Sequence, residues 1–125
     1  MQRIITSNKL PLVERVDEFI ALVDKEIGVD EAFPFGSTAK GKRQKTSDVD
    51  IIIVSRSFES IPHHERPGVL ENLWNYSEEL ESLTYTPEEF DRAKSRLLMR
   101  EILSYAKDLT PSRTKKARRK NRLRL

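Results

Sequence analysis

The chain contains no cysteine, and several features that define whole classes of protein are also missing. Without cysteine there is no disulfide scaffold, no cysteine-ligated zinc or iron–sulfur site and no thiol nucleophile. No apolar run approaches the roughly 20 residues that a membrane-spanning helix needs. The first residues show no apolar stretch followed by a small-residue cleavage site, so no signal peptide is predicted. We therefore expect a soluble, cytoplasmic protein whose 125 residues form a single folded domain.

Charged residues are plentiful and unevenly distributed. Lys and Arg total 23 and Asp and Glu total 20, for a formal net charge of +3. Eight basic residues and no acidic one lie in 113–125, which leaves 1–112 with 15 basic and 20 acidic side chains, a net of −5. We expect a folded domain over 1–112 and a basic, flexible tail over 113–125. The tail is expected either to be a solvated chain end or to bind nucleic acid with strong salt dependence.

Hydrophobic patterning predicts an α/β fold, in which helices flank a small mixed sheet. Apolar residues at helical spacing predict an amphipathic helix over 11–27. Short apolar runs predict three strands, over 31–35, 49–54 and 80–85. The middle run is rich in β-branched residues with almost no interruption, which is typical of a strand that is buried on both faces.

The second half of the chain is expected to supply two more helices. One is predicted over 69–76, after a proline-containing loop over 58–67 in which His63 and His64 are expected to be exposed. The residues 86–89, Thr-Pro-Glu-Glu, have the pattern of a capping box with proline in the first turn. They are predicted to begin a long helix that reaches Leu109.

A pair of aspartates leads into the middle strand. Asp48 and Asp50 are two residues apart, and side chains at that spacing point to the same face of a strand. Two carboxylates so close repel each other, and a divalent cation removes that repulsion. Magnesium prefers carboxylate oxygens and commonly shares its ligand shell with substrate phosphates. Such a pair alone is often only turn chemistry, so its surroundings decide the interpretation.

A glycine–serine turn follows the preceding strand. Gly36 allows the backbone to approach a phosphate, and the Ser37 hydroxyl adds a hydrogen-bond donor. Positive charge and a further hydroxyl surround the turn in the residues Lys40, Arg43 and Ser47. Together with the aspartate pair, this arrangement predicts a phosphate cradle next to a metal site.

The segment from Gly36 to Val54 resembles the signature of the nucleotidyltransferase superfamily related to DNA polymerase β, and in particular its minimal bacterial and archaeal members. Gly36, Ser37, Asp48 and Asp50 stand where that family has its Gly-Ser and Asp-x-Asp motifs. The resemblance implies a fold like the palm of polymerase β and a site for Mg²⁺, with two metal ions, and a nucleoside triphosphate such as ATP. The implied reaction transfers a nucleoside monophosphate to an acceptor hydroxyl.

The family also has a third carboxylate, on the strand that precedes a segment similar to residues 85–90. The corresponding residue here is Glu81, where family members usually have aspartate. Glutamate keeps the charge but moves the oxygens by about one bond length, and a misplacement on the order of 1 Å can cost around a hundredfold in rate. Glu81 is thus either the third metal ligand or an ordinary surface glutamate.

Three functions remain open at this level. The first is an active nucleotidyltransferase. Family members of this size often act with a helical partner of the HEPN toxin class, so the resemblance implies a toxin–antitoxin role. The second is a nucleotide- or nucleic-acid-binding module with weak catalysis, which uses the basic tail. The third is a regulatory subunit with a vestigial site.

Overall fold

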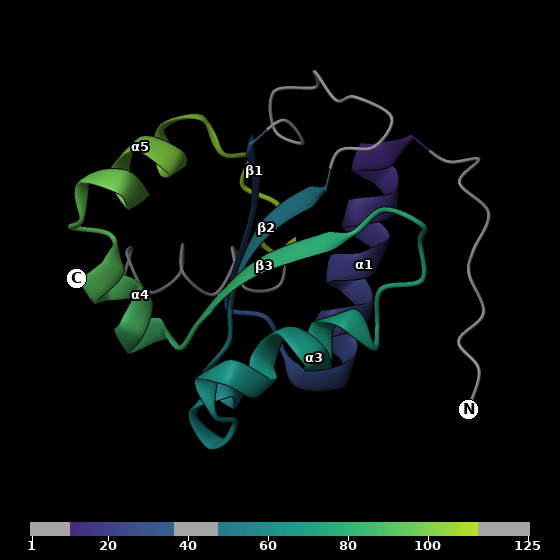
Figure 1. Ribbon diagram of the computed structural model, residues 1–125, viewed down its shortest axis with the longest axis horizontal. Coiled ribbons are helices and arrows are strands. Elements are labelled where there is room, and N and C mark those ends of the chain that lie inside the picture. Colours follow the sequence, from purple (N-terminus) through teal and green to yellow (C-terminus); the bar gives the residue numbers. More distant parts are fainter. Residues whose placement is uncertain (1–10, 37–47, 113–125) are drawn as a thin grey trace.

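The computed structural model describes residues 11–36 and 48–112, and these residues form a small mixed sheet between two layers of helices (Figure 1). The strands are β1 (Glu31–Phe35), β2 (Val49–Val54) and β3 (Leu80–Tyr85), in the order β1-β2-β3. β1 is antiparallel to β2, whereas β2 and β3 are parallel. The predicted strand bounds and the predicted mixed α/β class are confirmed.

One face of the sheet packs on α1 (Leu12–Ile27) and α3 (Arg66–Glu71) (Figure 1). Val49, Ile51 and Ile53 of β2 point into this layer. Trp74 also belongs to it, because its ring meets that of Phe19 edge to face, with centroids 5.0 Å apart. The amphipathic helix predicted over 11–27 is therefore confirmed, and its apolar stripe forms the larger core cluster.

The opposite face packs on α4 (Pro87–Ala93) and α5 (Leu97–Tyr105), which lie on the other side of the sheet in Figure 1. Ile52 and Val54 point into this second layer, where they are fully buried with Phe90 of α4. β2 is thus buried on both faces, as its composition predicts, and Asp50 is its one residue that is not fully buried.

The long helix predicted from Thr86 to Leu109 is wrong, because the chain turns between α4 and α5. Its start is as predicted: Thr86 and Glu89 form both hydrogen bonds of a capping box. Beyond it, the positions that face the sheet, Ala93 and then Met99, are six residues apart, which is out of phase with one straight helix. A turn that includes Arg96 restores the phase, and Leu97 is 80% exposed at the start of α5.

The end of α5 also differs from the expectation. After Tyr105 the chain is extended and runs beside β1, where the backbone N–H of Lys107 donates to the carbonyl of Pro34 (3.0 Å). The N–H of Leu109 donates in the same way to the carbonyl of Ala32 (3.0 Å). These bonds cover part of the outer edge of β1, an edge that would otherwise offer free backbone groups to another chain.

The connection between β2 and α3 is more regular than the predicted loop over 58–67. It contains two short 3₁₀ helices, η1 (Arg56–Ser60) and η2 (His63–Glu65). The helix predicted over 69–76 is displaced: α3 begins at Arg66, three residues before the predicted start, and ends at Glu71, five residues before the predicted end. Pro67 explains the early start, because its fixed φ and missing N–H suit the first turn of a helix. His63 and His64 are exposed, as expected.

Within residues 11–36 and 48–112, no helix is both long and apolar enough to cross a bilayer.

Candidate active site

The sheet register brings two of the three predicted carboxylates opposite each other. In the parallel pairing of β2 with β3, Asp50 lies opposite Glu81, and in the antiparallel pairing with β1, Asp50 lies opposite Phe35. Because side chains alternate along a strand, Asp50 shares the face of Ile52, which is the face covered by α4 and α5. The carboxylates therefore lie at the end of the sheet where β2 and β3 begin.

Gly36 closes this end of the sheet from the side of β1. It has a positive φ of 63°, a region that favours glycine. A β-carbon added to Gly36 would lie 2.5 Å from Oδ2 of Asp50. The missing side chain therefore allows the backbone after β1 to come into direct contact with the Asp50 carboxylate. This explains, in this chain, why the turn carries glycine next to the aspartate pair.

Asp48 completes a cluster of three carboxyl groups. A hydrogen bond with the Asp48 side chain is the main cause that raises the pKa of Glu81, and the negative charges of Asp48 and Asp50 and partial desolvation raise this pKa further. Burial is the main cause that raises the pKa of Asp50; the charge of Asp48 adds to this effect and a hydrogen bond with Glu81 opposes it. The three side chains thus occupy one small region, where the negative charges of Asp48 and Asp50 disfavour the ionisation of Glu81.

The donor set suits a hard divalent cation. Within the described ranges, no three His, Cys, Asp or Glu side chains are already arranged as a metal cluster. Instead, the carboxyl group of Glu81 lies close to those of both Asp48 and Asp50. A cation bound among the three side chains would have only oxygen ligands, which is the chemistry that Mg²⁺ prefers. The residues present therefore fit the metal that the fold implies.

A pocket of about 460 Å³ opens over these carboxylates. Asp50 and Glu81 line it together with Phe35 of β1 and Pro67 of α3. Pockets of a few hundred cubic ångströms are the usual size for small-molecule and cofactor sites. The charged end of a substrate could therefore reach the carboxylates while an apolar part rests on Phe35 and Leu83.

The other predicted nucleotide-binding residues lie outside the described residues. Ser37, Lys40, Arg43 and Ser47 all fall in 37–47, so only Gly36 of that set has a described position. The basic tail, 113–125, also lies outside the described residues.

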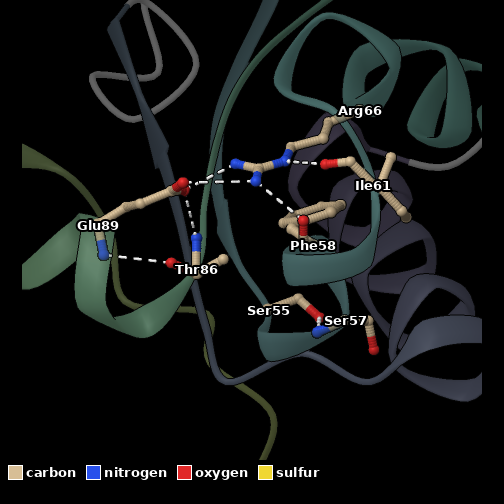
Figure 2. A network of polar contacts seen from close by, with 7 residues as sticks. All are labelled: Ser55, Ser57, Phe58, Ile61, Arg66, Thr86 and Glu89. Carbon is tan, nitrogen blue, oxygen red and sulfur yellow. Dashed lines mark hydrogen bonds and ion pairs between the residues drawn. The ribbon is translucent and has the colours of Figure 1, made fainter.

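A buried arginine at the start of α3, Arg66, was missed by sequence reasoning, and Figure 2 shows its contacts. Arg66 is only 5% exposed, and its guanidinium donates to the Glu89 carboxylate at 2.7 Å. It also donates to the backbone carbonyls of Ile61 (3.0 Å) and Phe58 (2.9 Å). The hydrogen bond from Arg66 to Glu89 is the main cause that lowers the pKa of Glu89. The capping box predicted the place of Glu89 but contained no signal for a partner 23 residues away.

The network ties α4 to the start of α3. Glu89 accepts from Arg66 and, through Oε1, from the backbone N–H of Thr86 at 2.8 Å (Figure 2). Nearby, the Ser55 hydroxyl accepts from the N–H of Ser57 at 3.2 Å and so caps η1. These bonds hold the end of β3 and the start of α4 in a defined position. β3 and α4 also line a second pocket on this face of the sheet.

This second pocket, of about 440 Å³, lies between β3 and the helices α4 and α5. Leu83 lines both pockets, so the second pocket adjoins the carboxylate pocket. Its other walls include Tyr85, Arg92, Arg96 and Leu98. The alternation of Glu81, Leu83 and Tyr85 along β3 was the signal that places this wall beside the carboxylates.

Comparison with known proteins identifies the family. The chain matches the nucleotidyltransferase domain family over residues 16–122, most of its length, and belongs to that family. The fold is similar to a crystal structure from Sulfolobus solfataricus of a protein assigned as a nucleotidyltransferase, with a TM-score of 0.51 and 22% sequence identity. The similarity covers 65% of this chain and 72% of that one. No curated protein matches the chain. The family resemblance of the Gly-Ser and Asp-x-Asp motifs is thereby confirmed.

Proposed function

We propose that this chain is a magnesium-dependent nucleotidyltransferase that moves a nucleoside monophosphate from a nucleoside triphosphate to an acceptor hydroxyl. The observation that carries the proposal is the cluster of Asp48, Asp50 and Glu81, of which Asp50 and Glu81 line a pocket and Asp50 lies in close contact with Gly36. Membership of the family and the mixed sheet support it.

Each residue of the cluster has a distinct role in this proposal. Asp48, Asp50 and Glu81 would hold Mg²⁺, which when bound neutralises their charge and that of the triphosphate. Gly36 lets the backbone after β1 lie against Asp50, and it is followed directly by Ser37, so the triphosphate is expected on the β1 side. Lys40, Arg43 and Ser47 are proposed to contact its phosphates.

The acceptor is expected on the opposite side, at β3. This strand is at the edge of the described sheet, and Glu81 is the most exposed of the three carboxylates. In the reaction the acceptor oxygen forms a bond to the α-phosphorus, and the bond from that phosphorus to pyrophosphate breaks. The proton of the hydroxyl then has to leave, and the Glu81 carboxylate is proposed to accept it.

The first experiment measures binding and turnover separately. Thermal unfolding of the full chain is followed with Mg²⁺ and each nucleoside triphosphate, and transfer of a radiolabelled monophosphate is assayed with EDTA as the metal-free control. Asp50→Asn is expected to abolish both the thermal shift and transfer. Glu79→Gln is the control for the loss of one negative charge, because Glu79 directly precedes β3 but lines neither pocket. An unchanged melting temperature with Mg²⁺ and every nucleotide would overturn the proposal.

Glu81→Asp tests the departure from the family residue. It restores the shorter side chain that family members usually carry, so we expect transfer to be retained or increased. Glu81→Gln removes the charge and is expected to reduce transfer about a hundredfold or more. Equal activity in the parent, Glu81→Asp and Glu81→Gln chains would show that Glu81 is only a surface residue.

A binding module with weak catalysis is the second candidate. The observation in its favour is that Glu81 hydrogen-bonds to Asp48 and the described residues contain no ready-made metal cluster. This candidate predicts a thermal shift with nucleotide but no transfer by either the parent or the Glu81→Asp chain. The HEPN-type partner and nucleic-acid binding through 113–125 remain predictions, to be tested by co-purification with a helical neighbour and by deletion of the tail.

A further inference from the structure

We propose that the buried ion pair of Arg15 with Glu78 positions the carboxylates of the candidate metal site, because it sets where β3 begins relative to β2. The inference rests on the proposed function, since it assigns residues that support the same three carboxylates. Neither Arg15 nor Glu78 lines the carboxylate pocket, so both are positioning residues that act through the backbone.

The connection between α3 and β3, residues 72–79, is attached to α1 (Figure 1). Nη1 of Arg15 donates to both carboxylate oxygens of Glu78, at 2.6 Å each. Both side chains are nearly enclosed, with exposed fractions of 8% and 11%. The Arg15 guanidinium also lies 5.4 Å from the centroid of the Tyr76 ring, and the Tyr76 hydroxyl donates to Oε2 of Glu18 at 2.9 Å. Two side chains one turn apart on α1 therefore hold this connection.

The backbone of the connection is held at the same place. The Trp74 indole N–H donates to the carbonyl of Glu78 at 2.7 Å, so the residue whose side chain binds Arg15 is also fixed through its backbone. At the next residue, the carbonyl of Glu79 accepts from the N–H of Val49 at 2.8 Å. This last bond uses only the backbone of Glu79. The contacts thus form a continuous chain from α1, through residues 74–79, to the first residue of β2.

The hydrogen bond between Val49 and Glu79 couples the two strands at the carboxylates. Val49 lies between Asp48 and Asp50, and Glu79 is two residues before Glu81. Because β2 and β3 are parallel, no tight turn joins them and sets their register. A slip of one residue would turn Glu81 to the opposite face of the sheet, and a misplacement on the order of 1 Å can cost about a hundredfold in rate.

Stability alone is a weak reason for an ion pair at this position. Well-packed apolar residues of similar volume are often as stabilising as a buried ion pair, because charges lose their hydration when they are buried. The contact of one Arg15 nitrogen with both Glu78 oxygens is directional, which an apolar contact is not. The pair also compensates one of the three negative charges in residues 78–81. We therefore infer that it contributes position more than stability.

The test replaces the ion pair with an apolar pair, in the double variant Arg15→Met/Glu78→Leu. This variant leaves neither charge buried without a partner, and methionine packs well against an aromatic ring such as that of Tyr76. Stability in urea is expected to equal or exceed that of the parent chain. The Mg²⁺ concentration at the midpoint of the thermal shift with nucleotide is expected to rise about tenfold, and kcat to fall about a hundredfold. KM for the nucleoside triphosphate is expected to change little, because the triphosphate is proposed to bind on the β1 side.

Val23→Ala is the control for a general loss of stability. Val23 is fully buried on α1, eight residues after Arg15. The cavity is expected to lower the stability of the core, while the Mg²⁺ midpoint and kcat stay at parent values at a temperature where the variant is folded. A parent-like Mg²⁺ midpoint and kcat in the double variant would overturn the inference. An equal loss of both in Val23→Ala would also overturn it.

Amide hydrogen exchange of the metal-free protein provides a measurement that does not depend on activity. In the double variant, the Val49 N–H is expected to exchange faster relative to that of Ile53 in the same strand, because its acceptor on Glu79 is held less firmly. Val23→Ala is expected to keep the parent ratio. An unchanged ratio in the double variant would overturn the inference alone. A parent chain that responds to neither Mg²⁺ nor any nucleotide would instead overturn the proposed function.

Discussion

Gly36→Ala tests two features of this position, which are the positive φ of its backbone and its close contact with the Asp50 carboxylate. The new β-carbon would lie 2.5 Å from Oδ2 of Asp50, a distance at which the carboxylate or the backbone must move. The residue also has a φ of 63°, and a side chain in such a region costs on the order of 1–3 kcal/mol. A displacement on the order of 1 Å at a reacting centre can cost about a hundredfold in rate.

Gly28→Ala is the matched control for that experiment. Gly28 has a φ of 83°, so its substitution is strained as well, but an added β-carbon would meet no atom within 4 Å. We expect both variants to lose on the order of 1–3 kcal/mol of stability, measured by urea unfolding. Only Gly36→Ala is expected to lose nucleotide transfer and the thermal shift with Mg²⁺. Equal activity of the two variants, with equal loss of stability, would refute the role assigned to the contact between Gly36 and Asp50.

Three further predictions concern stability. Arg66→Met removes the buried guanidinium that donates to the carbonyls of Ile61 and Phe58 and to the Glu89 carboxylate, and it is expected to lower the free energy of unfolding in urea by about 3 kcal/mol. A loss below about 1 kcal/mol would contradict this estimate. The pKa values of Asp50 and Glu81 are raised in the fold, so the folded state holds protons longer than the unfolded chain. The metal-free protein should therefore lose stability as the pH rises through these raised values, as followed by thermal unfolding; Mg²⁺ should reverse the loss, and Asp50→Asn should reduce it. Gly68→Ala, in α3 where an added β-carbon meets nothing within 4 Å, is expected to raise the free energy of unfolding by about 0.5–1 kcal/mol, and a decrease would be unexpected.

Local patterns in the sequence were sufficient for the strands and for part of the site. The bounds of all three described strands follow from apolar runs, because a strand buried on one or both faces needs such runs wherever it lies. The capping box at Thr86 is equally local, since its two hydrogen bonds join residues three apart. The two-residue period of a strand also predicted that Asp48 and Asp50 share a face; Asp50 lies in β2, whereas Asp48 directly precedes it.

Only the tertiary structure decided which distant residues meet. The place of Glu81 beside Asp50 depends on the parallel register of β2 with β3, and the contact of Gly36 with Asp50 depends on the antiparallel register with β1. The ion pair of Arg66 with Glu89 joins two elements across 23 residues. The turn between α4 and α5 brings residues of both helices onto one face of the sheet, a requirement that no helical period contains. Sequence periodicity reports the direction of a side chain, whereas its neighbour across the sheet is set by the packing of the whole domain.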